Sequence, residues 1–121
     1  MDWSETTRIV TTCGRGCAGA LQGELRALGH DPQVISPTSV EIEGDLREAM
    51  RLNLWLRTAN RVLFEVAGFE VDSPDELHAA VRDLPWEDWL RADVPFHVHG
   101  VAQHESIRDS RFAVLRCKDA I

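Results

Sequence analysis

The sequence has 121 residues, of which 44% are hydrophobic and 27% are charged, a balance typical of one globular domain or of two small units that share a core. Its apolar runs stay short of the roughly 18 residues that a membrane span needs, and its start, MDWSETTRIV, lacks the basic-then-apolar order of a signal peptide. The net charge of −7 disfavours a general attraction to nucleic acid, and three cysteines (Cys13, Cys17 and Cys117) indicate a reducing compartment, so we expect a cytoplasmic protein without membrane contact.

The first part of the chain predicts a strand, a helix and a β-hairpin. Residues 7–13, TRIVTTC, are rich in β-branched side chains and predict a buried strand. The following stretch, residues 14–29, carries a helical stripe of apolar residues and ends at Gly29, a typical helix stop. Two short strands are expected at residues 33–36 and 39–44, joined by a turn at Pro37 and Thr38.

A second helix and a long strand complete a recognisable order. Asp45 is a good N-cap for a helix over residues 46–59, where Trp55 is expected in the core, and residues 61–71 predict a strand. The elements follow one another as βαββαβ, the order of a ferredoxin-like unit, so we expect an α+β domain over residues 1–71.

The remaining residues, 72–121, predict an ααβα order. Ser73 with Glu76 forms a capping box that begins a helix, and Pro85 begins a short helical turn that contains Trp86 and Trp89. Residues 94–103, VPFHVHGVAQ, predict a single strand, which has no sheet of its own and needs a partner edge. A last amphipathic helix is expected after an N-cap at Asp109 or Ser110.

The last helix reverses the charge of the chain. Residues 106–121 contain four basic and two acidic side chains, a balance of +2, so the rest of the chain carries −9. An acidic body with a basic terminal segment is compatible with a local anion site, and equally with an ordinary solvated helix face.

Two motifs admit a different chemistry. Gly14, Gly16 and Gly19 spell G-x-G-x-x-G between a strand and a helix, the pattern of a dinucleotide-binding turn, although no acidic residue follows the next strand to bind a ribose. Cys13 and Cys17 together with His97 and His99 offer four zinc-type ligands, although Cys-x3-Cys across a strand end does not force the sulfurs together. We expect neither a nucleotide nor a metal site from these patterns.

Three stretches together resemble a known family. TCGRGCAGALQGELRALG resembles the opening strand and helix of THUMP-containing RNA methyltransferases, and most closely of the ribosomal RNA guanine-N2 methyltransferases. LREAMRLNLWLRTANRVLFEV resembles their next helix and strand, with an Arg-x-x-x-Arg pair before the strand, and ESIRDSRFAVLRCKDAI resembles the segment entering the central THUMP helix. The three stretches keep one order and spacing over nearly the whole chain.

The resemblance implies a ferredoxin-like domain over residues 1–71 and a THUMP domain over residues 72–121 that is truncated at its C-terminal side. In this family the THUMP region binds RNA for a separate C-terminal domain that uses S-adenosylmethionine. The Asn/Asp-Pro-Pro-Tyr type of motif of that domain does not occur here, because the chain has no tyrosine and no Pro-Pro pair. We therefore expect this chain alone to hold no catalytic residue and no cofactor, and to act with RNA and with its own methyltransferase domain.

The expected RNA contacts are basic and hydroxyl side chains at helix starts. Cations spaced along one helix face can meet successive phosphates, and a serine adds a neutral donor. The candidates are Arg108, Arg111, Lys118 and Ser110 in the last helix, with Arg15, Arg57 and Arg61 as weaker ones. The alternative hypothesis is a stand-alone protein-interaction or dimerisation domain of ferredoxin-like fold.

Overall fold

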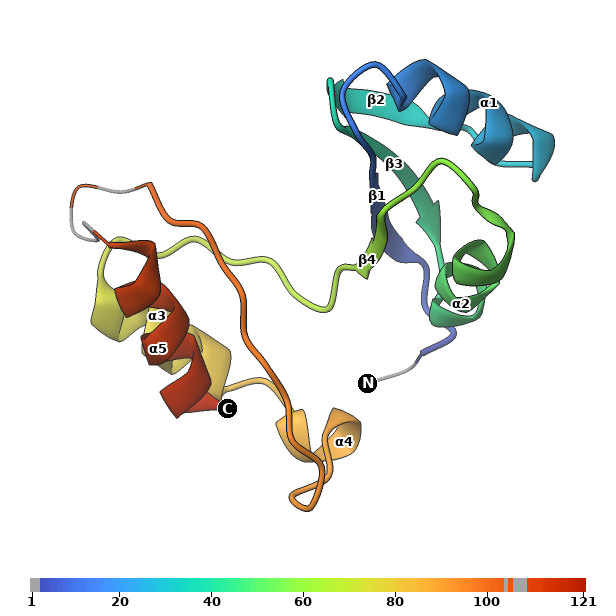
Figure 1. Ribbon diagram of the computed structural model, residues 1–121. Coiled ribbons are helices and arrows are strands. Elements are labelled where there is room, and N and C mark those ends of the chain that lie inside the picture. The colour runs from blue at the N-terminus through green and yellow to red at the C-terminus, as the bar shows by residue number, and fades with distance from the viewer. Residues whose placement is uncertain (1–2, 104, 106–108) are drawn as a thin grey trace. The chain divides into compact units, whose positions relative to one another are not determined.

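The computed structural model describes residues 3–103, 105 and 109–121 (Figure 1). The chain divides into two compact units, one ending at Gly68 and one beginning at Phe69, and each is described by itself. Arg108, one of the predicted RNA contacts, lies outside the described residues.

The first unit is a four-stranded antiparallel sheet with two helices. Its elements are β1 (Thr7–Thr12), α1 (Ala18–Ala27), β2 (Gln33–Ser36), β3 (Ser39–Gly44), α2 (Leu46–Trp55) and β4 (Arg61–Phe64). The strands lie in the order β2-β3-β1-β4, and every neighbouring pair is antiparallel. This arrangement confirms the predicted α+β, ferredoxin-like βαββαβ unit.

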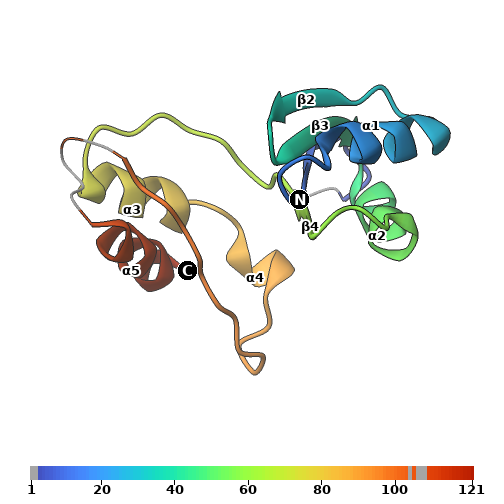
Figure 2. The ribbon, with the colours of Figure 1, turned by 45° about the horizontal axis from the view of Figure 1, so that its top comes forward.

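Both helices cover the same face of the sheet, as Figures 1 and 2 show. The core between them and the sheet is aliphatic, apart from the Thr11 side chain, whose hydroxyl donates to the Val40 carbonyl oxygen at 2.8 Å. A buried hydroxyl without such a partner costs about 1 to 3 kcal/mol. The buried apolar members are Ile9, Cys13, Leu21, Leu25, Val40, Ile42, Ala49 and Leu52.

Local chemistry sets the helix ends that the sequence predicted. Gly29 adopts φ +93°, and the N–H groups of Gly29 and His30 donate back to the Arg26 and Leu25 carbonyl oxygens, which ends α1. Asp45 caps α2 by accepting the Glu48 N–H at 2.8 Å. The N-cap of α1 is Cys17, whose side chain makes no capping hydrogen bond.

Three predictions in the first unit are wrong in extent or burial. The predicted helix over residues 46–59 ends at Trp55, and the predicted strand over residues 61–71 ends at Phe64. The strand is short because its partner β1 begins at Thr7, so pairing stops once the Glu65 N–H has reached the Arg8 carbonyl oxygen. Trp55, expected in the core, is 63% exposed.

The described residues of the second unit form the helices α3 (Pro74–Arg82), α4 (Trp86–Trp89) and α5 (Ser110–Ala120). Helices α3 and α5 pack side by side and bury Val81 and Ala120 (Figure 1). The predicted N-cap is present, since the Ser73 hydroxyl accepts the Glu76 N–H at 3.2 Å, whereas the Glu76 carboxylate accepts the Asp72 N–H at 2.7 Å and so does not close the predicted capping box on Ser73. The indole of Trp86 donates to the Val81 carbonyl oxygen at 2.6 Å and fastens α4 to α3.

Residues 94–103 form no strand, which corrects the predicted ααβα order. The segment passes α5, where a Cβ added to Gly100 would approach Val114 to 3.1 Å, but no backbone hydrogen bond joins residues 95–101 to another described residue. An extended segment becomes a strand only when a neighbouring strand pairs with it, and the described residues of this unit supply none.

Within the described residues, the helices are too short and too polar to cross a lipid bilayer.

Burial raises the pKa of the Cys117 thiol on α5 above its ordinary value.

Candidate nucleic-acid interface

The last helix places Arg111 and Lys118 on one face, seven residues apart. Each cation already has a neighbouring carboxylate: Arg111 pairs with Asp109 at 3.1 Å and Lys118 with Asp119 at 3.1 Å. Both pairs are exposed, and exposed pairs contribute about 0 to 1 kcal/mol each, so a phosphate can compete for these cations. The two local carboxylates nevertheless offset the formal charge of these two cations.

The Ser110 side chain forms hydrogen bonds within its own unit. Its hydroxyl accepts the Ala102 N–H at 2.9 Å and lies 3.4 Å from the Ala102 carbonyl oxygen, which fastens the segment before α5 to the helix start. Arg116 is committed in the same way, because its guanidinium pairs with Asp75 of α3 at 2.7 Å. Neither side chain is presented to solvent as a free donor.

The other three predicted arginines meet at one end of the sheet in the first unit. Arg61 begins β4 directly opposite Thr12, the last residue of β1, and the Asn60 N–H donates to the Thr12 carbonyl oxygen at 2.7 Å. Arg15 lies in the loop that leaves this same end of β1, and Arg57 lies in the connection that enters β4. We call this the arginine end, defined by Arg15, Arg57 and Arg61.

The arginine end is free of ion pairs. All three side chains are exposed and none makes a side-chain hydrogen bond or salt bridge with any described residue. The stretches that build it, residues 11–23, 32–40 and 49–61, contain no aspartate and no glutamate, although the chain has 20 such residues. These stretches therefore carry no negative charge of their own, which favours a local positive field at this end.

One carboxylate underlies the arginine end and is occupied. Glu24 of α1 accepts the Thr58 N–H at 2.8 Å, the Thr58 hydroxyl at 2.5 Å and the Arg57 N–H at 3.1 Å. The Thr58 hydroxyl, followed by these backbone donors and the Arg57 charge, holds the pKa of Glu24 below its ordinary value. The carboxylate thus fixes the loop between α2 and β4 that carries Arg57.

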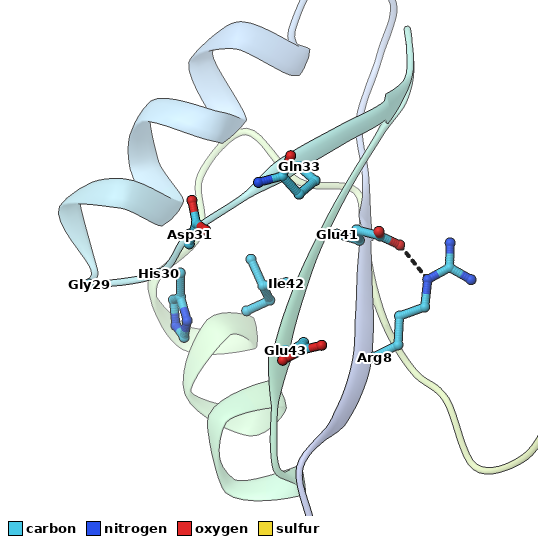
Figure 3. Close-up of a pocket in the computed structure, with 8 residues that line it drawn as sticks. All are labelled: Arg8, Gly29, His30, Asp31, Gln33, Glu41, Ile42 and Glu43. Carbon is cyan, nitrogen blue, oxygen red and sulfur yellow. Dashed lines mark hydrogen bonds and ion pairs between the residues drawn. The ribbon is translucent and has the colours of Figure 1, made fainter.

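The groove in Figure 3 has the opposite character. It encloses about 540 Å³ and is lined by Arg8, Gly29, His30, Asp31, Gln33, Glu41, Ile42 and Glu43. Its one arginine, Arg8, is bonded to Glu41, as the dashed line marks, so carboxylates dominate the lining. A polyanion is repelled there, which leaves the arginine end as the better phosphate site in this unit.

The glycine loop does not form a nucleotide cradle. Only Gly16 has a left-handed backbone, with φ +85°, and a Cβ added to Gly14, Gly16 or Gly19 would meet no atom within 4 Å. The sheet is antiparallel, whereas dinucleotide-binding folds use a parallel one. Gly14 and Gly16 lie in the loop that carries Arg15 from the end of β1 to α1, and Gly19 lies within α1.

The metal pattern also fails to form a cluster. Cys13 is buried in the core of the first unit, and the rings of His97 and His99, which meet edge to face with 4.3 Å between centroids, belong to the second unit. Among the described residues, no three of the histidine, cysteine, aspartate and glutamate side chains gather closely enough to hold an ion.

The sequence predicts Arg15, Arg57 and Arg61 as separate candidates. It does not predict that they share one end of the sheet. The strand register joins them, and register requires the fold. A signal was nevertheless present in the sequence, since three acid-free stretches interrupt an acidic chain. No pattern in the sequence predicted that the Glu24 carboxylate would hold the loop that carries Arg57.

Comparison with known proteins identifies the first unit. Residues 8–63 match the family model of the RlmL ferredoxin-like domain. The chain is 40% identical over 109 residues to a ribosomal RNA large subunit methyltransferase K/L of Cellvibrio japonicus, covering 90% of this chain and 14% of that protein. It is 38% identical over 114 residues to the Syntrophotalea carbinolica protein of the same name, covering 94% of this chain and 16% of that protein. The chain thus spans about one seventh of the length of these relatives.

Solved structures agree with this relationship. A protein described as a predicted N6-adenine-specific DNA methylase from Listeria monocytogenes matches with a TM-score of 0.81 and 34% identity, over 96% of this chain and 30% of that one. A putative methyltransferase complexed with SAH matches with a TM-score of 0.81 and 30% identity, over 99% of this chain and 31% of that one. Residues 8–63 therefore match the RlmL ferredoxin-like domain, and the chain as a whole is similar to part of the ribosomal RNA large subunit methyltransferases that its sequence resembles.

Proposed function

We propose that this chain is the RNA-recognition region of a larger S-adenosylmethionine-dependent methyltransferase that modifies a guanine at N2 in ribosomal RNA. The relatives named above are ribosomal RNA methyltransferases, and one similar structure holds SAH, the product of methyl transfer from S-adenosylmethionine. In this proposal the cofactor and the catalytic residues belong to the rest of the enzyme. The residues of this chain bind and orient the RNA.

The observation that carries the proposal is the arginine end. Three exposed guanidinium groups that form no ion pair with the described residues suit the sugar-phosphate backbone, because phosphate contacts supply most of the affinity of RNA-binding surfaces. Arg111 and Lys118 on α5, with Arg108 beyond the described residues, form a second set of proposed contacts. Their neighbouring aspartates predict a smaller contribution than that of the arginine end.

Binding of a labelled fragment of large-subunit ribosomal RNA to the purified chain tests the proposal by fluorescence anisotropy. We expect Arg15→Ala, Arg57→Ala and Arg61→Ala combined to lower the affinity by about tenfold or more at low salt. The matched control is Arg26→Ala, which removes an exposed arginine at the last turn of α1, and we expect it to change affinity less than about twofold.

The double variant Arg111→Ala with Lys118→Ala ranks the two surfaces and is expected to fall between the control and the triple variant. Wild-type affinity in the triple variant contradicts the assignment to the arginine end. Absence of RNA binding by the wild-type chain at low salt contradicts the proposed function.

A protein-interaction or dimerisation role is the second candidate, and one observation favours it. Residues 95–101 offer backbone groups without hydrogen-bond partners among the described residues, beside the exposed side chains of Val94, Phe96 and Val101. An extended segment of this kind can pair with a strand of another chain. Light scattering that shows a stable dimer in the micromolar range supports this role, and a monomer contradicts it.

A further inference from the structure

Trp55 occupies an unusual place at the end of α2. The helix packs its Ala49 and Leu52 side against the sheet, while Trp55 is 63% exposed. The indole makes no hydrogen bond or ring contact with another described residue. A tryptophan normally buries most of its large apolar surface, so one that stands in water at a helix end is available to a partner.

The charge around Trp55 indicates what kind of partner fits. The residue lies within the acid-free stretch 49–61, two positions before Arg57 and one helical turn after Arg51. Arg51 pairs with Glu48 on its own helix, whereas Arg57 has no ion pair and belongs to the arginine end. The indole therefore stands next to a positive surface that contains no competing free carboxylate.

We propose that Trp55 is a stacking platform for an unpaired base of RNA, with the neighbouring phosphates held at the arginine end. This inference rests on the proposed function and specifies its ligand as a single-stranded segment, because only an unstacked base can lie on an aromatic side chain. Stacking on an aromatic residue tolerates any base, since each has a π-face, whereas the arginines bind the backbone on either side.

A protein partner would use the same helix differently. Trp3, Leu46, Met50 and Leu54 line an apolar groove on the adjacent face of α2, and Leu54 is 84% exposed. A protein docking on α2 would bury this groove together with Trp55, so Leu54 would matter as much as Trp55. A nucleobase covers about one side chain, so Leu54→Ala is the matched control.

The experiment compares the purified chain with its Trp55→Ala, Trp55→Phe and Leu54→Ala variants. Two labelled probes are used at low salt, an unstructured 12-nucleotide RNA and a 12-base-pair RNA duplex. We expect Trp55→Ala to weaken binding of the single strand between about fivefold and 150-fold, the range known for base–aromatic stacking, and to leave duplex binding unchanged. Trp55→Phe keeps an aromatic face and should retain most of the affinity, whereas Leu54→Ala should stay within about twofold of wild type.

Two further readouts separate stacking from a structural effect. The dependence of affinity on salt should be equal in wild type and Trp55→Ala, because the phosphate contacts remain. Binding of the single strand should also quench part of the tryptophan fluorescence of the wild-type chain. The same probe should cause less quenching in Trp55→Phe, which keeps the other three tryptophans.

Each outcome decides one of the two proposals. If Trp55→Ala binds the single strand as tightly as wild type does, the stacking inference is overturned. An equal loss of single-strand affinity in Leu54→Ala also overturns it. In both cases the RNA-recognition function stands. Loss of duplex and single-strand binding in parallel also overturns the stacking inference. A wild-type chain that binds neither probe contradicts the proposed function itself.

Discussion

Glu24 shows how one side chain can organise a loop without touching a ligand. Its carboxylate accepts hydrogen bonds from the backbone N–H groups of Arg57 and Thr58 and from the Thr58 hydroxyl. Without Glu24 these donors would have to hydrogen-bond to water. They belong to the loop that carries Arg57 and leads to Arg61 at the end of the sheet. The side chain therefore positions arginines whose charge is opposite to its own.

Glu24→Gln should destabilise the first unit by about 1 to 2 kcal/mol at neutral pH, because an amide cannot accept from three donors as a carboxylate does. The pKa of Glu24 is lowered by folding, so its stabilising effect is complete above the ordinary glutamate pKa of about 4.3 and is lost as the pH falls through the lower, folded value. Urea unfolding at pH 7 and at pH 3 measures this difference. Glu5→Gln, which removes an exposed carboxylate, is the control, and an equal effect of both variants would show that charge alone matters.

At the scale of elements, α2 has two apolar faces and the structure covers one of them. Leu52 is fully buried against the sheet, whereas Leu54, two residues later, is 84% exposed. The periodicity of the sequence could not decide between these faces, since both recur at helical spacing. For that reason Trp55 was predicted in the core and lies in water.

Leu52→Ala should cost about 2 to 5 kcal/mol of unfolding free energy, because it leaves a cavity between α2 and the sheet. Leu54→Ala should change stability by less than about 0.5 kcal/mol. Thermal unfolding followed by circular dichroism compares the two variants. A similar cost at both positions would mean that the outer face of α2 is covered in solution.

The elements that the sequence predicted well are those with a local cause. Gly29, Asp45 and Ser73 end or begin helices through groups a few residues away, so the pattern alone was sufficient. Strand length failed at residues 65–71 and 94–103 because pairing depends on partners distant in the chain. The candidate site divides in the same way: single arginines could be named from the sequence, but their common location follows from the register of β1 with β4.

At the scale of the whole molecule, an acidic chain whose basic residues are concentrated in small areas should bind RNA weakly and with strong salt dependence. The net charge of −7 opposes a polyanion, whereas the arginine end attracts one. The chain corresponds to 14% and 16% of the two relatives named above, so the affinity of a complete enzyme has further sources.

Raising the salt from about 50 to about 200 mM should lower the affinity of this chain for RNA by roughly 20-fold to 40-fold if three phosphates are contacted. Arg57→Ala should reduce the slope of log affinity against log salt by about 0.7 to 0.9, which is one contact. Anisotropy titrations at four salt concentrations give the slope. A slope near zero would show that the interaction is not electrostatic.

The three thiols of the chain differ in a way that is useful to an experimenter. Cys13 is buried in the core and burial raises the pKa of Cys117, so maleimide reagents should prefer Cys17 at the start of α1. Cys17 lies two residues from Arg15. A reporter dye attached there would sense, from within the proposed binding surface, the arrival of a nucleic acid strand.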